Sequence, residues 1–286
     1  DAYIEKIANT FNLADDTNNS DFPFPVSSPE AFQKNKDQAQ KEDIQYYQSL
    51  VGSVNYAAIS TRLDISKYSN KLAEFMSKPS PVQISFAERL ISYLYSTHFL
   101  SIQYSNSSSI LELDVSSDAT FADDIEMRYS SQGYFFRLFG GGVTWSAKHQ
   151  QNVTTSSTEV EPLALTSTAK ELMTTLRLFN SILLRLDAQI PTIECDNMQT
   201  FRLITAELRK IRTSLKHVDV HNCWSRQEYL KGTFDIKYTP SSKIVADGFT
   251  KLHTQQKFLQ FRHLLQPIKN KPQITIELES DSEDLF

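Results

Sequence analysis

The stretch Thr158–Leu186, TEVEPLALTSTAKELMTTLRLFNSILLRL, decides how the rest of the chain is interpreted. Its apolar residues recur alternately four and three positions apart, which is the spacing of one buried helix face. These residues are Leu165, Ala169, Leu172, Leu176, Phe179, Leu183 and Leu186. Glu161 lies four residues before the first of them, so the pattern predicts a buried helix with an acid at its head.

Two interpretations of Glu161 are open at this point. Thr158 and Glu161 have the spacing of a capping box, in which the glutamate satisfies a backbone amide at the start of the helix. Alternatively, Glu161 faces a sheet that carries further carboxylates.

Composition places the chain among ordinary globular proteins. Its 286 residues allow one large domain or two small ones, and 40% of them are hydrophobic. No apolar run reaches about 18 residues, so we expect no membrane span. The first residues, Asp1–Lys6, include neither an initiator methionine nor a signal peptide, which suggests a processed product or a fragment. Cys195 and Cys223 form no metal-binding pair and suggest a reducing compartment.

Charge is unevenly distributed along the chain, although the net charge is only −5. The segment 202–271 holds 14 Lys and Arg residues against five acids, whereas the residues after Pro272 hold five acids and no base. A basic segment between acidic ends suggests a polyanionic partner. A solvated helical surface is the alternative.

Pattern changes along the chain divide it into four parts. Residues 1–43 read as a short helix followed by a Pro-containing linker, and residues 44–100 as three helices. Residues 101–268 alternate strands with helices, which predicts an α/β domain with a mixed sheet. Its hairpin turns at Gly140–Gly142. Residues 269–286 read as an acidic, disordered tail.

Three further acids lie where a site built on a sheet would need them. Asp118 and Asp196 each end a predicted strand, and Asp247 opens the last helices. Each could instead be structural; in particular, Asp118 suits a turn, and Asp196-Asn197 suits a helix N-cap. Convergent carboxylates repel one another, and divalent cations such as Mg²⁺ or Mn²⁺ remove that repulsion. The four acids therefore predict a metal-dependent phosphodiesterase site.

From about Tyr46 to Gln266 the chain resembles the C-terminal end of the Pol polyprotein of copia-type LTR retrotransposons. That end consists of a connection region followed by a ribonuclease H domain. The motifs that carry the resemblance are Tyr47–Ser53 (YQSLVGS), Thr61–Ile65 (TRLDI), Gly133-Tyr134, Val143–Lys148 (VTWSAK), Ser156–Glu161 (SSTEVE), Ala169–Glu171 (AKE), Cys195–Asn197 (CDN), Lys216–Asp219 (KHVD), Tyr238–Pro240 (YTP) and Ala246–Lys251 (ADGFTK).

The resemblance implies a ribonuclease H-like mixed five-stranded sheet with flanking helices, preceded by a helical connection unit. Residues 1–43 would then be the end of a reverse transcriptase and its linker. The implied activity is hydrolysis of the RNA strand of RNA–DNA hybrids with two Mg²⁺ ions, for which Mn²⁺ can substitute. Asp118 would bridge both ions, Glu161 and Asp196 would hold one, and Asp247 would complete the other. Glu159 falls off the apolar stripe, so we assign it to the surface.

The resemblance also implies partners and a location. The partners would be an RNA–DNA hybrid and a reverse-transcriptase polymerase domain or subunit, in a cytoplasmic virus-like particle or, alternatively, in the nucleus. Basic residues in the 202–226 segment are our candidates for contacts to the nucleic-acid backbone. They are Arg202, Arg209, Lys210, Arg212, Lys216 and Arg226.

The sequence departs from the family in several places. Thr120 replaces a second acid, and Pro162 replaces an aromatic residue, which a first helical turn tolerates. No histidine lies between Tyr238 and Asp247, where some relatives have one that assists product release. The polymerase motif Tyr-x-Asp-Asp is absent, so we expect no polymerase activity.

Two other functions fit part of the pattern. The departures favour a domesticated or decayed fragment that binds nucleic acid or acts as a scaffold without catalysis, although all four acids are retained. An integrase-like nuclease on the same fold is a further alternative, but it would carry a different last acid.

Overall fold

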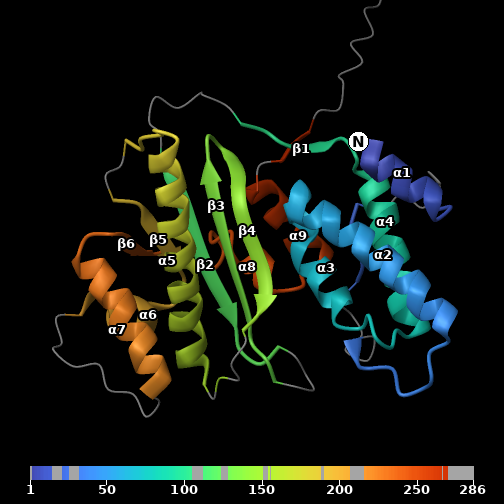
Figure 1. Ribbon diagram of the computed structural model, residues 1–286, viewed down its shortest axis with the longest axis horizontal. Helices are drawn as coiled ribbons and strands as arrows, with labels where there is room; N and C mark the ends of the chain where they lie inside the picture. The colour runs from blue at the N-terminus through green and yellow to red at the C-terminus, as the bar shows by residue number, and fades with distance from the viewer. Residues whose placement is uncertain are drawn as a thin grey trace, which may run out of the picture.

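A computed structural model describes residues 2–14, 21–25, 32–104, 112–123, 128–150, 154, 156–187, 190–206, 216–265 and 267–269 (Figure 1). Only the backbone is described for residues 157, 216–219 and 267–269. None of the helices in these ranges is both long and apolar enough to cross a membrane.

A five-stranded mixed sheet forms the centre of the second half of the chain. Its strand order is β4-β3-β2-β5-β6. The strands are β2 (Leu113–Thr120), β3 (Ser131–Leu138), β4 (Gly141–His149), β5 (Thr192–Cys195) and β6 (Asp235–Tyr238). The pairs β2–β3 and β3–β4 are antiparallel, whereas β2–β5 and β5–β6 are parallel because helices connect them. The mixed five-stranded sheet predicted from the sequence is confirmed.

The β3–β4 hairpin turns slightly earlier than we expected. Phe139 and Gly140 form the turn with positive φ angles of 53° and 79°. Gly141 and Gly142 already belong to β4, where Gly142 lies against the ring of Phe135 and a Cβ would be 2.8 Å from that ring. The three glycines therefore serve a turn and a close strand approach together.

Helices α5 (Ser157–Ser181), α6 (Met198–Thr205) and α7 (Lys216–Leu230) cover one face of the sheet (Figure 1). The predicted stripe on α5 packs here, because Leu165, Ala169 and Leu172 are fully buried in a core shared with β2, β3 and β5. The prediction that the stripe continues to Leu186 on the same helix was wrong. Leu183 lies beyond the helix with a φ of 61° and is 83% exposed, because α5 stops at Ser181.

The opposite face is covered by α8 (Asp247–Thr250), α9 (Gln255–Leu264) and, beyond them, a helical unit near the N-terminus (Figure 1). This unit consists of α1 (Ala2–Thr10), α2 (Lys41–Ser60), the 3-10 turn η3 (Leu63–Ile65), α3 (Ser66–Ala73) and α4 (Pro81–Ser96). A short antiparallel pair, β1 (Leu100–Ile102) and β7 (Pro267–Lys269), lies at its edge.

One hydrophobic core joins the helical unit to the sheet. Phe258 of α9 is fully buried between rings of the helical unit, with Tyr68 at 5.4 Å and Tyr93 at 5.7 Å between centroids. On the sheet side, Phe249 of α8 stacks on Phe135 of β3 at 5.8 Å. The two parts therefore pack as one body, and the domain boundaries read from the sequence stay predictions.

The predicted linker and tail fall only partly within the described residues. Phe22 and Phe24 of the linker are buried in the core of the helical unit, so this part of the linker is packed. Lys269, the first residue of the predicted acidic tail, belongs to β7, and residues 270–286 lie outside the described residues.

Candidate active site

Three of the four acids predicted from the sequence meet at one end of the sheet. Asp118 lies on β2, Asp196 directly follows β5, and Glu161 lies near the start of α5. One carboxylate oxygen from each of the three lies within 4.8 Å of the other two. Elements distant in the sequence therefore bring three anionic ligands to one point, as a divalent cation requires.

The local structure leaves the Asp196 carboxylate available to bind a cation. Asn197, not Asp196, is the N-cap of α6, since its side chain accepts a hydrogen bond from the amide of Thr200 at 2.8 Å. Asp196 instead accepts a hydrogen bond from the hydroxyl of Ser241 at 2.6 Å. Asn197 therefore caps the helix, and Asp196 does not.

The start of α5 excludes the capping-box interpretation of Glu161. The helix begins after Ser156, so Thr158 lies inside it, and its hydroxyl bonds to that of Ser156 at 2.8 Å. We expected Pro162 in the first turn of the helix, but it lies further inside. It has no backbone N–H to donate to the carbonyl of Thr158. Glu159 was assigned to the surface, and this was wrong: it is only 9% exposed.

Burial and mutual repulsion perturb the carboxylates. Burial, followed by the charges of Asp118 and Asp196, raises the pKa of Glu161 to about 9. Burial also raises the pKa of Asp118 to about 7, against the opposing effect of Lys251. Both shifts arise because several anions share a space with little water.

These residues fit a divalent cation. Asp118 Oδ1 is buried and has no hydrogen-bond partner among the described residues, and the neighbouring acids supply only further oxygen acceptors. Such a donor set suits hard cations such as Mg²⁺ or Mn²⁺, which bind carboxylate oxygens and would offset the repulsion.

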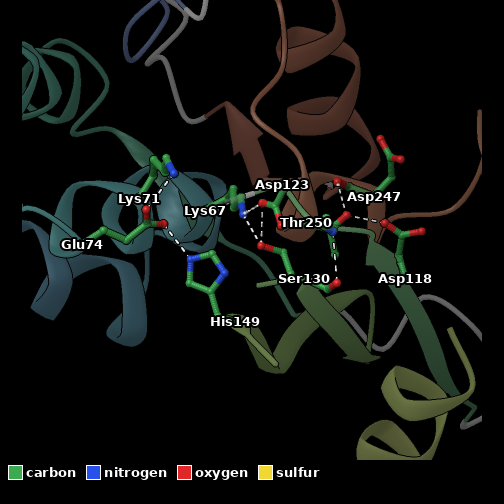
Figure 2. A network of polar contacts seen from close by, with 11 residues as sticks. Lys67, Lys71, Glu74, Asp118, Asp123, Ser130, His149, Asp247 and Thr250 are labelled. Carbon is green, nitrogen blue, oxygen red and sulfur yellow. Dashed lines mark hydrogen bonds and ion pairs between the residues drawn. The ribbon is translucent and has the colours of Figure 1, made fainter. Parts of the chain in front are cut away.

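Asp247, the fourth predicted acid, does not join this group of three. It lies at the start of α8, where the ammonium of Lys251 pairs with its Oδ1 and also lies 3.7 Å from Asp118 Oδ2 (Figure 2 shows the two acids). Burial lowers the pKa of Lys251, but Asp118 and Asp247 outweigh it and raise that pKa overall. The fourth acid is therefore connected to the first through a lysine.

Two more residues after Asp247 were missed as site residues. The hydroxyl of Thr250 donates to Asp118 Oδ2, and His253 Nε2 lies 3.6 Å from Asp247 Oδ2. Burial lowers the pKa of His253, which favours the neutral ring. Thr250 and Lys251 belong to the ADGFTK motif and could have been found from it. His253 could not, because the resemblance pointed to a histidine only between Tyr238 and Asp247, where this chain has none.

Polar contacts from helix α3 fix the helical unit to this end of the sheet (Figure 2). Lys67 is almost fully buried and donates to Asp123 Oδ2 at 2.9 Å and to the hydroxyl of Ser131 at 2.6 Å. A second contact joins Glu74, near the end of α3, to His149 Nε2 of β4 at 2.7 Å. Asp123 closely follows β2, so these contacts hold the strand end that carries Asp118.

The basic residues predicted to bind nucleic acid lie mostly beyond what the structure describes. Arg202 is exposed in the last turn of α6, and Arg226 is half-buried on α7. Only the backbone of Lys216 is described, and Arg209, Lys210 and Arg212 lie outside the described residues. Their role stays a prediction.

Comparison with curated proteins identifies the family. The chain is 30% identical over 212 residues to the retrovirus-related Pol polyprotein from transposon TNT 1-94 of Nicotiana tabacum, covering 74% of this chain. It is also 30% identical over 217 residues to that from transposon RE1 of Arabidopsis thaliana, covering 75% of this chain. The chain belongs to the copia-type Pol polyproteins. It spans only 16% and 14% of these two Pol polyproteins.

The chain is also similar to a shorter protein. Secreted RxLR effector protein 161 of Plasmopara viticola is 37% identical over 125 residues, which cover 44% of this chain and 87% of the effector. No protein-family model matches the chain.

Solved structures similar to this Pol segment include ribonucleases H. LC11-RNase H1, isolated from compost and solved with an RNA/DNA hybrid, is 14% identical; the match covers 48% of this chain and 93% of that one, with a TM-score of 0.36. The N-terminal RNase H domain of rv2228c from Mycobacterium tuberculosis is 9% identical; the match covers 54% and 97%, with a TM-score of 0.35.

Proposed function

We propose that this chain is the ribonuclease H part of a copia-type Pol polyprotein and hydrolyses the RNA strand of RNA–DNA hybrids. The observation that carries the proposal is the convergence of Asp118, Glu161 and Asp196 within 4.8 Å, from three separate elements of the fold. Membership of the Pol family supports it, because reverse transcription creates such hybrids. The first alternative from the sequence, a non-catalytic scaffold, would not need these acids at one point.

The four acids would share two divalent ions in this proposal. Asp118, Glu161 and Asp196 would hold one divalent ion, and Asp247 would hold a second together with Asp118. When bound, Mg²⁺ or Mn²⁺ supplies a Lewis acid for the phosphoryl oxygens and lowers the pKa of water. Glu161 and Asp118 must release their protons to act as ligands. Thr250 orients the Asp118 carboxylate through its hydrogen bond to Oδ2.

The substrate and partners follow from the same proposal. The enzyme would choose hybrids by helical shape and 2′-hydroxyl contacts, without reading the base sequence. A reverse-transcriptase polymerase domain or subunit would supply the hybrid. We propose a cytoplasmic virus-like particle as the place of action, with the nucleus as the alternative.

A cleavage assay with matched variants tests the proposal. The chain is incubated with Mg²⁺ and a hybrid labelled on its RNA strand, beside duplex DNA of the same sequence. Asp196→Asn should lower the cleavage rate at least ~100-fold, because it removes one of the converging carboxylates. Asp37→Asn is the control, since Asp37 is exposed and distant from the site in sequence.

Two outcomes would contradict the proposal. Equal cleavage by Asp196→Asn and the unmodified chain would show that the acids are not the catalytic ones. Cutting of duplex DNA but not of the hybrid would favour the integrase-like alternative.

One observation favours a non-catalytic chain as the second candidate. Lys251 pairs with Asp247 and lies near Asp118, so two of the four acids already have a protein cation. Binding of Mg²⁺ with no cleavage of any hybrid would support this second candidate.

A further inference from the structure

A hollow of about 580 Å³, lined by both polar and apolar side chains, opens beside the candidate active site and shares Asp247 and Lys251 with it. Ser241 lies at the boundary: it lines the hollow, and its hydroxyl donates to Asp196 Oδ2 at 2.6 Å. The far side is formed by α9, including Lys257. The hollow is therefore continuous with the carboxylates.

The charges that line this hollow favour an anionic ligand. Asp247 is the acid of the lining, and Lys251 already pairs with it. Lys257 is exposed, and its ammonium forms no hydrogen bond or ion pair with the part of the chain that the structure describes. Such an exposed ammonium can pair with a ligand phosphate without first breaking an internal contact.

The uncharged lining groups suit a nucleic-acid backbone better than its bases. Ser242, Thr254 and Gln260 are exposed hydroxyl and amide groups, which can donate to phosphate oxygens and sugar hydroxyls. Phe261 is the phenyl ring in the lining, but it is only 4% exposed and offers no face for base stacking. The exposed polar groups of the hollow therefore suit a ligand that is read by charge and hydrogen bonding.

The fold fixes the position of the Lys257 backbone relative to the acids. Its neighbour Phe258 is fully buried against Tyr68 and Tyr93 of the helical unit. Helix α8 approaches α9 so closely that a Cβ on Gly248 would lie 2.2 Å from the ring of Phe261. Packing thus fixes both walls of the hollow, and the helical unit supports one of them.

We propose that this hollow binds the sugar–phosphate backbone of the substrate strand, with Lys257 pairing with a phosphate near the carboxylates. The inference rests on the proposed function and deepens it, because it gives the bound strand a direction. The strand would run from the carboxylates along α9, toward the helical unit that positions this helix.

A binding experiment that needs no catalysis tests the inference. The parent is the Asp196→Asn chain in Mg²⁺, and the probe is a fluorescently labelled RNA–DNA hybrid measured by anisotropy at several salt concentrations. Lys257→Gln should weaken binding about 3- to 10-fold at 0.1 M salt and reduce the salt slope by about 1, as expected for one lost phosphate contact. Lys6→Gln is the control, because Lys6 is an exposed lysine on the distant α1 (Figure 1).

The loss should be the same for two hybrids of unrelated sequence, because a phosphate contact does not read bases. Equal affinity and equal salt slope for Lys257→Gln and its parent would overturn the inference. So would a loss confined to one of the two hybrid sequences. Failure of the proposed function would give a different result. The parent would still bind the hybrid through Lys257, but the unmodified chain would not cleave the hybrid.

Discussion

The ammonium of Lys251 lies 3.7 Å from Asp118 Oδ2, although the two residues are on different elements, one following α8 and the other on β2. Lys251 also pairs with Asp247, so one cation connects the first and last acids of the predicted set. A divalent ion held between those two acids would compete with this lysine. The lysine therefore couples the charge state of the site to metal binding.

We expect Lys251→Met to bind divalent metal about tenfold more tightly, because four acids then lack an internal cation. Without metal, the variant should be less stable than the unmodified chain, and Mn²⁺ should raise its melting temperature by more. The measurement is thermal unfolding in EDTA and in a Mn²⁺ titration.

Lys6→Met is the matched control for this lysine, since its side chain is exposed on α1. An equal metal-induced rise in melting temperature for Lys251→Met and the unmodified chain would show that Lys251 does not compete with metal.

The raised pKa values of the acids predict how stability depends on pH in the absence of metal. Glu161 has a folded pKa of about 9 against an ordinary 4.5, and Asp118 about 7 against 3.8. The folded chain therefore keeps protons that the unfolded chain has released, so stability should fall as the pH rises from about 4 to about 9. Glu161→Gln should weaken this dependence and be more stable than the unmodified chain by ~2 kcal/mol at pH 8.

Urea unfolding in EDTA between pH 5 and pH 9 measures this effect. The control is Glu5→Gln, an exposed glutamate in the first turn of α1. Parallel stability profiles for Glu161→Gln and the unmodified chain would mean that Glu161 titrates normally.

A buried ion pair in the helical unit gives a third prediction. Arg62 is 2% exposed, and its guanidinium donates to both carboxylate oxygens of Asp64 at 2.9 and 2.8 Å. Tyr93 also donates to Asp64, at 2.7 Å. Arg62→Met should lower the free energy of unfolding by about 3–5 kcal/mol, because it leaves a buried carboxylate without its cation.

Denaturant unfolding measures this loss, and Arg62→Met with Asp64→Leu should recover part of it, because no charge then stays buried. The control is Lys237→Met, whose exposed pair with Glu194 at 3.1 Å should contribute less than about 1 kcal/mol. A loss below that of the control would contradict the prediction.

Two glycines should respond in opposite ways to the same added methyl group. In Gly248→Ala the new Cβ would meet the ring of Phe261 at 2.2 Å, so the variant should lose about 1–3 kcal/mol of stability and bind metal more weakly. Gly52 lies within α2, and a methyl group added there would meet no described atom within 4 Å, so Gly52→Ala should gain about 0.5–1 kcal/mol. Melting temperatures of both variants, with and without Mn²⁺, measure the contrast.

Phe261→Leu combined with Gly248→Ala should recover part of the loss, because the smaller side chain makes room for the methyl group. If Gly248→Ala alone is as stable as the unmodified chain, α8 and α9 do not pack this closely.

Sequence alone predicted the features that depend on local periodicity and local motifs. The stripe from Leu165 to Leu172 gave a buried helix, and the alternating strands with a glycine hairpin gave a mixed sheet. Periodicity failed at Leu183 and Glu159, because it says which residues share a helix face but not where the helix ends or what covers its other faces.

Tertiary structure alone decided the contacts that join distant segments. Thr250 donates to Asp118 across 132 residues of sequence, and Lys251 lies between the first and last acids because α8 packs against β2 and β3. Phe258 joins the helical unit to the sheet through a shared core. The sequence by itself determined which acids were available and on which kinds of element, because these follow from short spacings. Which acids meet, and which one pairs with a lysine, depended on the packing of elements far apart in the chain.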